Sequence, residues 1–158
     1  MPAKKKSARK PAKKAARKTA RPKAGATRKQ PETLRLREAT PGYTVNDIHR
    51  SLAWYQNVLG CIVVERWEKE GQLRGATLRA GAVDFYLGQD DWKMGRDRVK
   101  GAGFRIYCTT RQSVDALAAR IKARGGTLLH DPQDEPWGER DFAIADPDGF
   151  KITISQAR

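Results

Sequence analysis

The chain has 158 residues, a length suited to one ordinary domain, and a formal net charge of +14. The charge is uneven: 13 of the 32 basic residues lie within residues 1–29, and all 18 acidic residues lie at or beyond Glu32. The rest of the chain is therefore close to neutral, and its sequence holds no apolar run near the ~20 residues that a membrane-spanning helix needs.

Residues 1–30 predict a disordered arm, because they contain no Leu, Ile, Val, Phe, Trp or Tyr to bury against the entropy lost on ordering. The Lys, Ala and Pro repetition resembles the tails of linker-histone-like proteins in composition. A mobile polycation neutralises phosphates without reading sequence, and without aromatic rings it has no base-stacking platform. We therefore expect the arm, placed at residues 1–32, to bind duplex nucleic acid non-specifically.

The basic residues expected to contact phosphates are Lys4, Lys5, Lys6, Arg9, Lys10, Lys13, Lys14, Arg17, Lys18, Arg21 and Lys23. Ribosomal RNA, an anionic lipid surface and a purely solubilising tail stay open as alternatives. The folded domain is expected over residues 33–158.

The sequence pattern in the first half of this domain predicts one helix and four strands. Apolar residues at helical spacing predict a helix over Ile48–Leu59, which Asn46 or Asp47 can cap and Gly60 can end. Alternating or β-branched runs predict the strands, at residues 34–39 (continuing to 43–45), 61–67, 74–78 and 82–87.

After a polar linker at residues 88–101, the same order recurs. Ser113 can cap a second helix, with Val114, Leu117, Ala118 and Ile121 on one face, and two glycines end it. Strands are expected at residues 104–109, 127–130, 140–145 and 150–155.

The two halves thus repeat the order β-α-β-β-β, in units of about residues 33–90 and 102–157. We expect an α+β fold in which the two units form a cupped mixed sheet. The stretch NDIHRSLAWYQNVLG, followed later by PWGERDFAIADPDGFKI, resembles the glyoxalase/bleomycin resistance protein/dioxygenase superfamily, also called vicinal oxygen chelate (VOC) proteins. The resemblance covers about residues 34–156 and implies the same fold.

The resemblance also implies four metal-ligand positions, on the first and last strands of each unit. In this chain they fall near Thr40, at Phe85 or Tyr86, within residues 104–106 and at Thr153. None of these is a His, Glu, Asp or Cys, the residues that hold divalent metals in such sites. We therefore expect no metal and no cofactor, as in the metal-free branch of the superfamily.

Other reactive side chains favour plainer interpretations. Cys61 and Cys108 lack metal-binding spacing and are expected to be small buried hydrophobes in a reducing compartment. His49 and His130 are expected at the surface. The carboxylates around Trp137 could perform acid–base chemistry, but a solvated acidic loop is favoured. They are Asp134, Glu135, Glu139 and Asp141.

What remains is a binding cup. Aromatic rings supply flat apolar walls, and an arginine can pair with a carboxylate or stack on a ring. The residues expected to line the cup are Trp54, Tyr86, Tyr107, Trp137, Arg140 and Thr153. The metal-free branch resembles drug-sequestering proteins, often homodimers with clefts between chains, so the resemblance implies an unknown small molecule and a second copy of the chain as partners.

We therefore expect a cytoplasmic small-molecule binding or resistance-like protein, held at the nucleoid if its arm binds DNA. Two alternatives stay open. One is an enzyme of the lyase, isomerase or dioxygenase class with an unknown substrate. The other is a dimeric, chromatin-type protein that bridges DNA through paired arms. Metal analysis of the purified protein would separate the enzyme from the binding protein.

Overall fold

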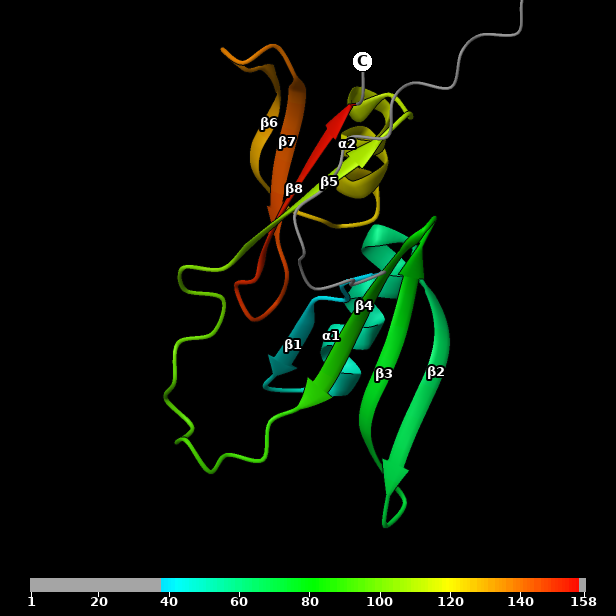
Figure 1. The fold of residues 1–158 in the computed structure, drawn as a ribbon, viewed down its shortest axis with the longest axis vertical. Helices are drawn as coiled ribbons and strands as arrows, with labels where there is room; N and C mark the ends of the chain where they lie inside the picture. Colours follow the sequence, from blue (N-terminus) through cyan, green and yellow to red (C-terminus); the bar gives the residue numbers. More distant parts are fainter. Residues whose placement is uncertain (1–37, 157–158) are drawn as a thin grey trace, which may run out of the picture. The chain divides into compact units, whose positions relative to one another are not determined.

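A computed structural model describes residues 38–156, which lie within one compact unit; the predicted basic arm lies outside the described residues. The chain order of elements repeats, with four strands and a helical segment in each half (Figure 1). The first half comprises β1 (Gly42–Val45), α1 (Ile48–Trp54), η1 (Tyr55–Leu59), β2 (Ile62–Lys69), β3 (Gln72–Ala80) and β4 (Val83–Gln89). The second comprises β5 (Arg105–Thr110), α2 (Val114–Ala123), β6 (Leu128–Asp134), β7 (Arg140–Ala145) and β8 (Lys151–Gln156).

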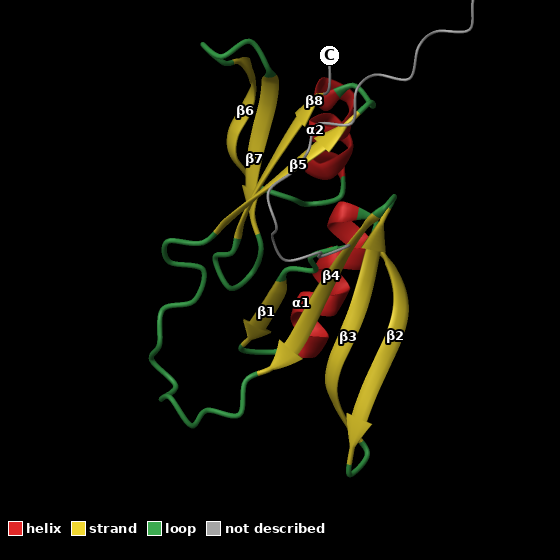
Figure 2. Cartoon of the chain, viewed as in Figure 1, coloured by secondary structure: helices red, strands yellow, loops and turns green. Residues whose placement is uncertain are grey.

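Each half forms its own four-stranded mixed sheet (Figure 2). Sheet A has the order β1-β4-β3-β2, and sheet B has the order β5-β8-β7-β6. The first and last strands of each half pair in parallel, and the remaining neighbours are antiparallel. The predicted α+β fold of two βαβββ units is confirmed.

The first helix begins as the sequence predicts, because the Asp47 side chain accepts hydrogen bonds from the backbone N–H groups of His49 and Arg50. It does not stay α-helical to its end. The last turn, η1, is a π-helix that stops at Gly60, whose φ of 80° is the left-handed conformation that glycine adopts without strain. The predicted helix over residues 48–59 is therefore two joined segments.

Within the described residues, the first strand begins later than the sequence suggests. Residues 34–37 lie outside the described range, and residues 38–40 are not in a strand. One edge strand of sheet A is β1, where Tyr43 and Val45 are fully buried and fix the side of the sheet that faces the core.

One apolar core joins the two halves. Strand residues that face the helices, such as Leu78 and Phe142, are completely buried and belong to one cluster with helix residues such as Ile48 and Val114. The α1 segment contacts β3 and β4, while α2 contacts β6, β7 and β8. Each sheet therefore has one face covered by a helix, and we call the opposite side of each sheet its open face.

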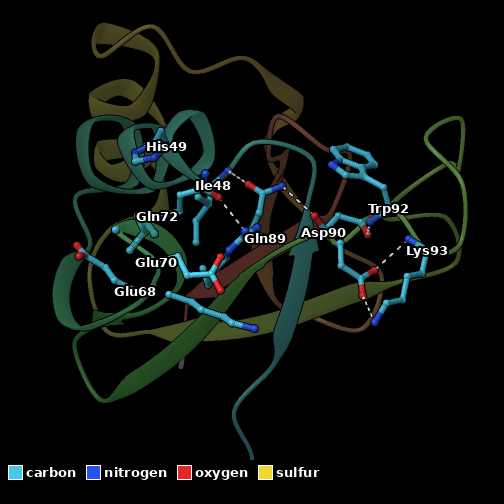
Figure 3. Close-up of a pocket in the computed structure, with 14 residues that line it drawn as sticks. Ile48, His49, Glu68, Glu70, Gln72, Gln89, Asp90, Trp92 and Lys93 are labelled. Carbon is cyan, nitrogen blue, oxygen red and sulfur yellow. Dashed lines mark hydrogen bonds and ion pairs between the residues drawn. The ribbon is translucent and has the colours of Figure 1, made fainter.

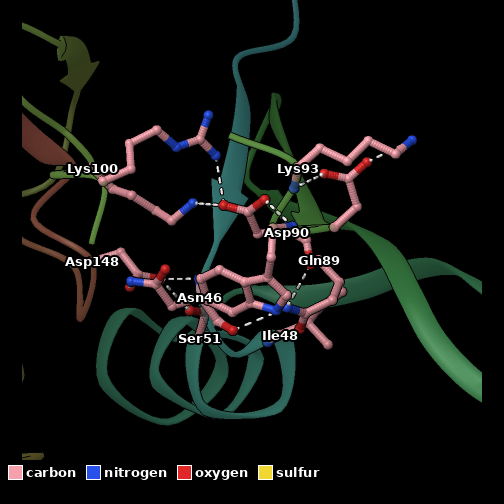
Figure 4. Close-up of polar contacts among 11 residues, drawn as sticks. Asn46, Ile48, Ser51, Gln89, Asp90, Lys93, Lys100 and Asp148 are labelled. Carbon is pink, nitrogen blue, oxygen red and sulfur yellow. Dashed lines mark hydrogen bonds and ion pairs between the residues drawn. The ribbon is translucent and has the colours of Figure 1, made fainter. Parts of the chain in front are cut away.

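Polar contacts between residues far apart in sequence also tie the halves together, and Figure 4 shows those between Asn46 and Asp148. Asp148, in the turn between β7 and β8, accepts hydrogen bonds from the backbone and side-chain nitrogens of Asn46 at 3.0 and 2.6 Å. Tyr55 donates its hydroxyl to the buried carboxylate of Asp146 at 3.2 Å. The DPDG turn is thus a docking point for the first half as well as a β-turn.

A buried ion cluster anchors the connection between the halves. Asp90, 3% exposed, accepts from the Arg98 guanidinium at 2.5 Å and from the Lys100 ammonium (Figure 4). Its other oxygen accepts from the backbone N–H of Trp92 at 2.9 Å. Lys100, whose side chain is 3% exposed, holds the pKa of Asp90 down to about 2. The linker predicted as merely polar is therefore fixed at its start by buried charges.

Candidate functional site

The open face of sheet A carries a tyrosine that lies across three glycines. A Cβ added at Gly75 would meet the Tyr86 Oη at 2.9 Å. At Gly88 and Gly42 it would meet carbons of the same ring at 3.3 and 3.5 Å. The glycines therefore leave room for the ring to lie against the sheet, where it stays 40% exposed. The result is a flat aromatic surface, which suits stacking with a planar ligand.

Trp67 extends this surface. Its ring packs edge-on against Tyr86, with ring centroids 5.3 Å apart and an interplanar angle of 62°. Trp67 is 38% exposed, so part of this large apolar side chain is left uncovered by the rest of the described protein. We call Tyr86, Trp67 and the three glycines the aromatic platform.

Sequence reasoning found Tyr86 and missed Trp67. Counting alternate residues from Ile62 along β2 sends Trp67 to the helix-covered face. A register shift between Val63 and Glu65 inserts one residue and reverses the alternation, so Trp67 lies opposite Gly75 on the open face.

The open face of sheet B is polar. Arg105 of β5 donates to the buried Thr153 hydroxyl of β8 at 2.9 Å, and Tyr107 on the same strand is 75% exposed. Asp141 of β7 pairs in register with Ser155, and His130 of β6 lies beside it. Charged and hydroxyl groups from four strands thus share one face.

Two predicted site residues lie away from the open faces, and a third lies in a loop. Arg140 makes a two-pronged ion pair with Asp115 of α2, at 3.0 and 2.7 Å, which places it on the helix-covered side of sheet B. Trp54 lies in α1, packs edge-on against the buried Tyr55 and contacts the core. Trp137 is 67% exposed in the β6–β7 loop. The structure therefore brings Tyr107 and Thr153 together and separates them from Arg140 and Trp54.

The positions at which the resemblance implies metal ligands can be located in the structure. Tyr86 lies on the open face of sheet A and Thr153 on that of sheet B, and Arg105, from the range 104–106, donates to Thr153 on the same face. These side chains are a phenol, a hydroxyl and a guanidinium. Across residues 38–156, no three His, Cys, Asp or Glu side chains gather closely enough to hold a metal ion. That the protein binds no metal stays a prediction, which metal analysis of the purified protein tests.

The prediction that both cysteines are buried holds for Cys61 but not fully for Cys108, which is half-buried against the core. Cys61 is buried, and burial raises the pKa of its thiol to about 11. Burial also raises the pKa of the Cys108 thiol. Both thiols are thus held in their protonated, weakly nucleophilic form.

A hollow of about 910 Å³ lies beside the start of α1 and the β2–β3 turn (Figure 3). Its polar groups are already engaged. The Gln89 amide accepts from the Ile48 N–H at 3.0 Å and donates to the Asn46 carbonyl at 2.9 Å. Asp91 pairs with Lys93 at 3.1 Å in an exposed contact. No buried polar group described at this hollow lacks a partner, so we do not assign it a ligand.

Comparison with known families places the chain. Residues 37–154 match the model of the Glyoxalase/Bleomycin resistance protein/Dioxygenase superfamily. The chain belongs to this superfamily. The match spans both βαβββ units and confirms the resemblance expected from the helix and turn motifs.

No curated protein sequence matches the chain. No described helix is long and apolar enough to cross a bilayer.

Solved structures with this VOC fold are numerous. A superfamily member from Sphaerobacter thermophilus DSM 20745 is 25% identical, with a TM-score of 0.64 over 78% of this chain and 100% of its own. TioX from Micromonospora sp. ML1 is 20% identical, with a TM-score of 0.62 over 75% of this chain and 98% of its own. TnmS3, an antibiotic binding protein from Streptomyces sp. CB03234, is 22% identical, with a TM-score of 0.61 over 80% and 100%. The last two show similarity of fold.

Proposed function

We propose that this VOC protein binds a small molecule with a planar aromatic part, and that the aromatic platform is the surface on which that part stacks. The observation that carries the proposal is the Tyr86 ring, which lies over Gly42, Gly75 and Gly88 and is bordered by Trp67. Fold similarity to an antibiotic binding protein supports it. No donor set for a catalytic metal is found at the described ligand positions, which favours binding over metal-dependent catalysis.

A second copy of the chain is the partner that we propose for the open faces. Large apolar side chains remain uncovered there, including Tyr86, Trp67 and Ile62 on sheet A and Tyr107 on sheet B. Exposed apolar patches of this kind mark interaction surfaces. A dimer would enclose the ligand between one sheet face from each chain. Light scattering on the full chain should give twice the monomer mass of 17.7 kDa, and the monomer mass would contradict this arrangement.

If the ligand stacks on Tyr86, truncation of this side chain should lower the affinity for a planar aromatic molecule. We expect anthracene-9-methanol, a neutral three-ring probe, to bind the full-length protein, and Tyr86→Ala to weaken binding about tenfold, since aromatic pairs contribute ~0.5–1.5 kcal/mol beyond buried area. Probe fluorescence measures the affinity. Met94→Ala is the control, because Met94 is 75% exposed in the linker and makes none of the aromatic or glycine contacts that define the platform. Equal affinity in Tyr86→Ala and wild type would contradict the platform assignment.

We also propose that the basic arm binds nucleic acid, on the strength of its 13 positive charges within residues 1–29. Each phosphate contact adds ~0.9 to the slope of log affinity against log salt. Replacing Lys4, Lys5 and Lys6 by Ala should therefore lower that slope by about 2–3 for duplexes of any sequence. Fluorescence anisotropy with two unrelated duplexes tests this. An unchanged slope, or a strong preference for one duplex, would argue against the arm.

A further inference from the structure

The open face of sheet B contains a buried carboxylate with an unpartnered oxygen. Asp141 is 4% exposed, and its Oδ1 has no hydrogen-bond partner within residues 38–156. Its neighbours Phe142 and Ile144 face the helix and are fully buried in the core, so alternation along β7 directs Asp141 to the open face. A buried carboxylate oxygen without a donor is costly to leave that way.

The nearby histidine does not resolve this shortage while it is neutral. His130 has its Nε2 3.7 Å from Asp141 Oδ1, and its Nδ1 3.1 Å from the backbone oxygen of Asp131. Both ring nitrogens therefore face acceptors. A neutral imidazole has one N–H and can serve only one of them. In either neutral tautomer the ring donates to at most one of the two oxygens, and its Nε2 is too far from Asp141 Oδ1 for a hydrogen bond.

The other charged groups around Asp141 add to the demand for a donor. Burial raises the pKa of Asp141, and the negative charges of Glu135 and Glu139 in the preceding β6–β7 loop act in the same direction. Arg105 and His130 oppose them. The Arg105 guanidinium already donates to the Thr153 hydroxyl at 2.9 Å. A cationic group that reached Asp141 would find a buried carboxylate oxygen without a donor and a surrounding excess of negative charge.

We propose that Asp141 anchors the ligand by accepting a hydrogen bond from a protonated amine or a similar cationic N–H group. This inference rests on the proposed function, since it names the second half of the same ligand: a planar aromatic body for the platform of sheet A and a cationic donor for sheet B. The two parts would meet in the cleft between one sheet face of each chain in the dimer. The ligand class is therefore a planar aromatic amine or amidine.

Three probes with the same tricyclic shape test the charge preference. They are 9-aminoacridine, a cation at neutral pH; anthracene-9-methanol, which is neutral; and anthracene-9-carboxylate, an anion. We expect the full-length protein to bind the cation at least tenfold more tightly than the neutral probe, and the anion most weakly. Asp141→Asn should remove about tenfold or more of the cation's affinity and leave the neutral probe unchanged, because hydrogen bonds to a charged group are the stronger ones.

Asp134→Asn is the matched control. Asp134 has an 84% exposed side chain and pairs with Arg140 on the helix-covered side. Asp134→Asn therefore removes one negative charge, as Asp141→Asn does, but leaves Asp141 in place. In this variant we expect the three probes to keep the order of affinity that they have for the wild-type protein. A loss of cation affinity equal to that in Asp141→Asn would show that only the general charge of the region matters, and would overturn the assignment.

The wild-type protein gives a second test that needs no folded variant. Protonation of Asp141 removes its negative charge, so affinity for 9-aminoacridine should fall, relative to the neutral probe, as the pH is lowered from 7 to 4. Parallel pH profiles for the two probes would overturn the inference, as would equal cation affinity in wild type and Asp141→Asn. The proposed function would stand in both cases if binding still depends on Tyr86. Absence of binding by all three probes would overturn the proposed function itself.

Discussion

Replacing Asp90 by asparagine should destabilise the fold by about 3–5 kcal/mol, because it leaves a buried ammonium without its counter-charge. The Lys100 side chain is 3% exposed, and its described charge partner is this carboxylate. Arg98, bonded to the same oxygen, would lose its partner too. Urea denaturation of wild type and variant measures the difference in the free energy of unfolding.

Asp91→Asn is the control for this prediction. Asp91 is the adjacent carboxylate and also pairs with a lysine, but its side chain is 59% exposed and that of Lys93 is 83% exposed. Exposed pairs of this kind contribute little, so we expect a change below about 1 kcal/mol. Equal losses in Asp90→Asn and Asp91→Asn would contradict the view that burial makes the Asp90 cluster important.

The Asp90 cluster also predicts a contribution to acid sensitivity. Its pKa is lowered from the ordinary 3.8 to about 2, chiefly by the hydrogen bond from Lys100. A carboxyl whose pKa is lower in the folded state stabilises the fold above its unfolded pKa, and loses that effect as the pH falls towards the folded value. The difference in stability between wild type and Asp90→Asn should therefore shrink between pH 4 and pH 2.

Replacing Gly101 by alanine is expected to destabilise the protein by about 2–5 kcal/mol, for two reasons that add. Gly101 has a φ of 65°, which penalises any residue with a Cβ. Its added Cβ would also lie 2.2 Å from the backbone oxygen of Gly149 and 2.5 Å from the backbone nitrogen of Phe150. Side-chain rotation cannot relieve a clash with backbone atoms, so the linker would move away from the β7–β8 turn.

Gly103→Ala separates these two reasons. Gly103 lies in the same linker with a φ of 70°, but a Cβ there would meet nothing within 4 Å. We expect it to show only the conformational penalty, about 1–2 kcal/mol. Calorimetry, used to monitor thermal unfolding, compares the stability of the two variants. A loss in Gly103→Ala as large as that in Gly101→Ala would show that the close contact with the turn has no energetic role.

Much of the fold was predictable from local patterns. The helix cap at Asp47, the glycine that ends the first helical segment, and the strand alternation around Phe142 are each encoded within a few residues. The repeat of β-α-β-β-β order then predicted the two sheets. The helix-covered position of Arg140 was also available from the sequence, because Arg140 shares the alternation of Phe142 and Ile144 in β7.

The site was less predictable, because it depends on register between strands. Trp67 reaches the open face only through the register shift beside Val63. Asp141 was grouped with a solvated acidic loop, but the structure places it inside β7, between Ser155 of β8 and Gln133 of an extended β6. Such placements depend on which residues from distant parts of the chain lie opposite one another, and local spacing does not contain that information.

The most direct measurement of the central claim is a titration of the ¹⁵N-labelled full-length protein with anthracene-9-methanol, followed by amide chemical shifts. A ring stacked on Tyr86 would lie over the three glycines that contact it, so the account predicts the largest glycine shifts at Gly42, Gly75 and Gly88. Gly71 and Gly125, which have open space around them, should not move. Saturable shifts at the three platform glycines would support a ligand on the open face of sheet A, and saturable shifts confined to other residues would contradict it.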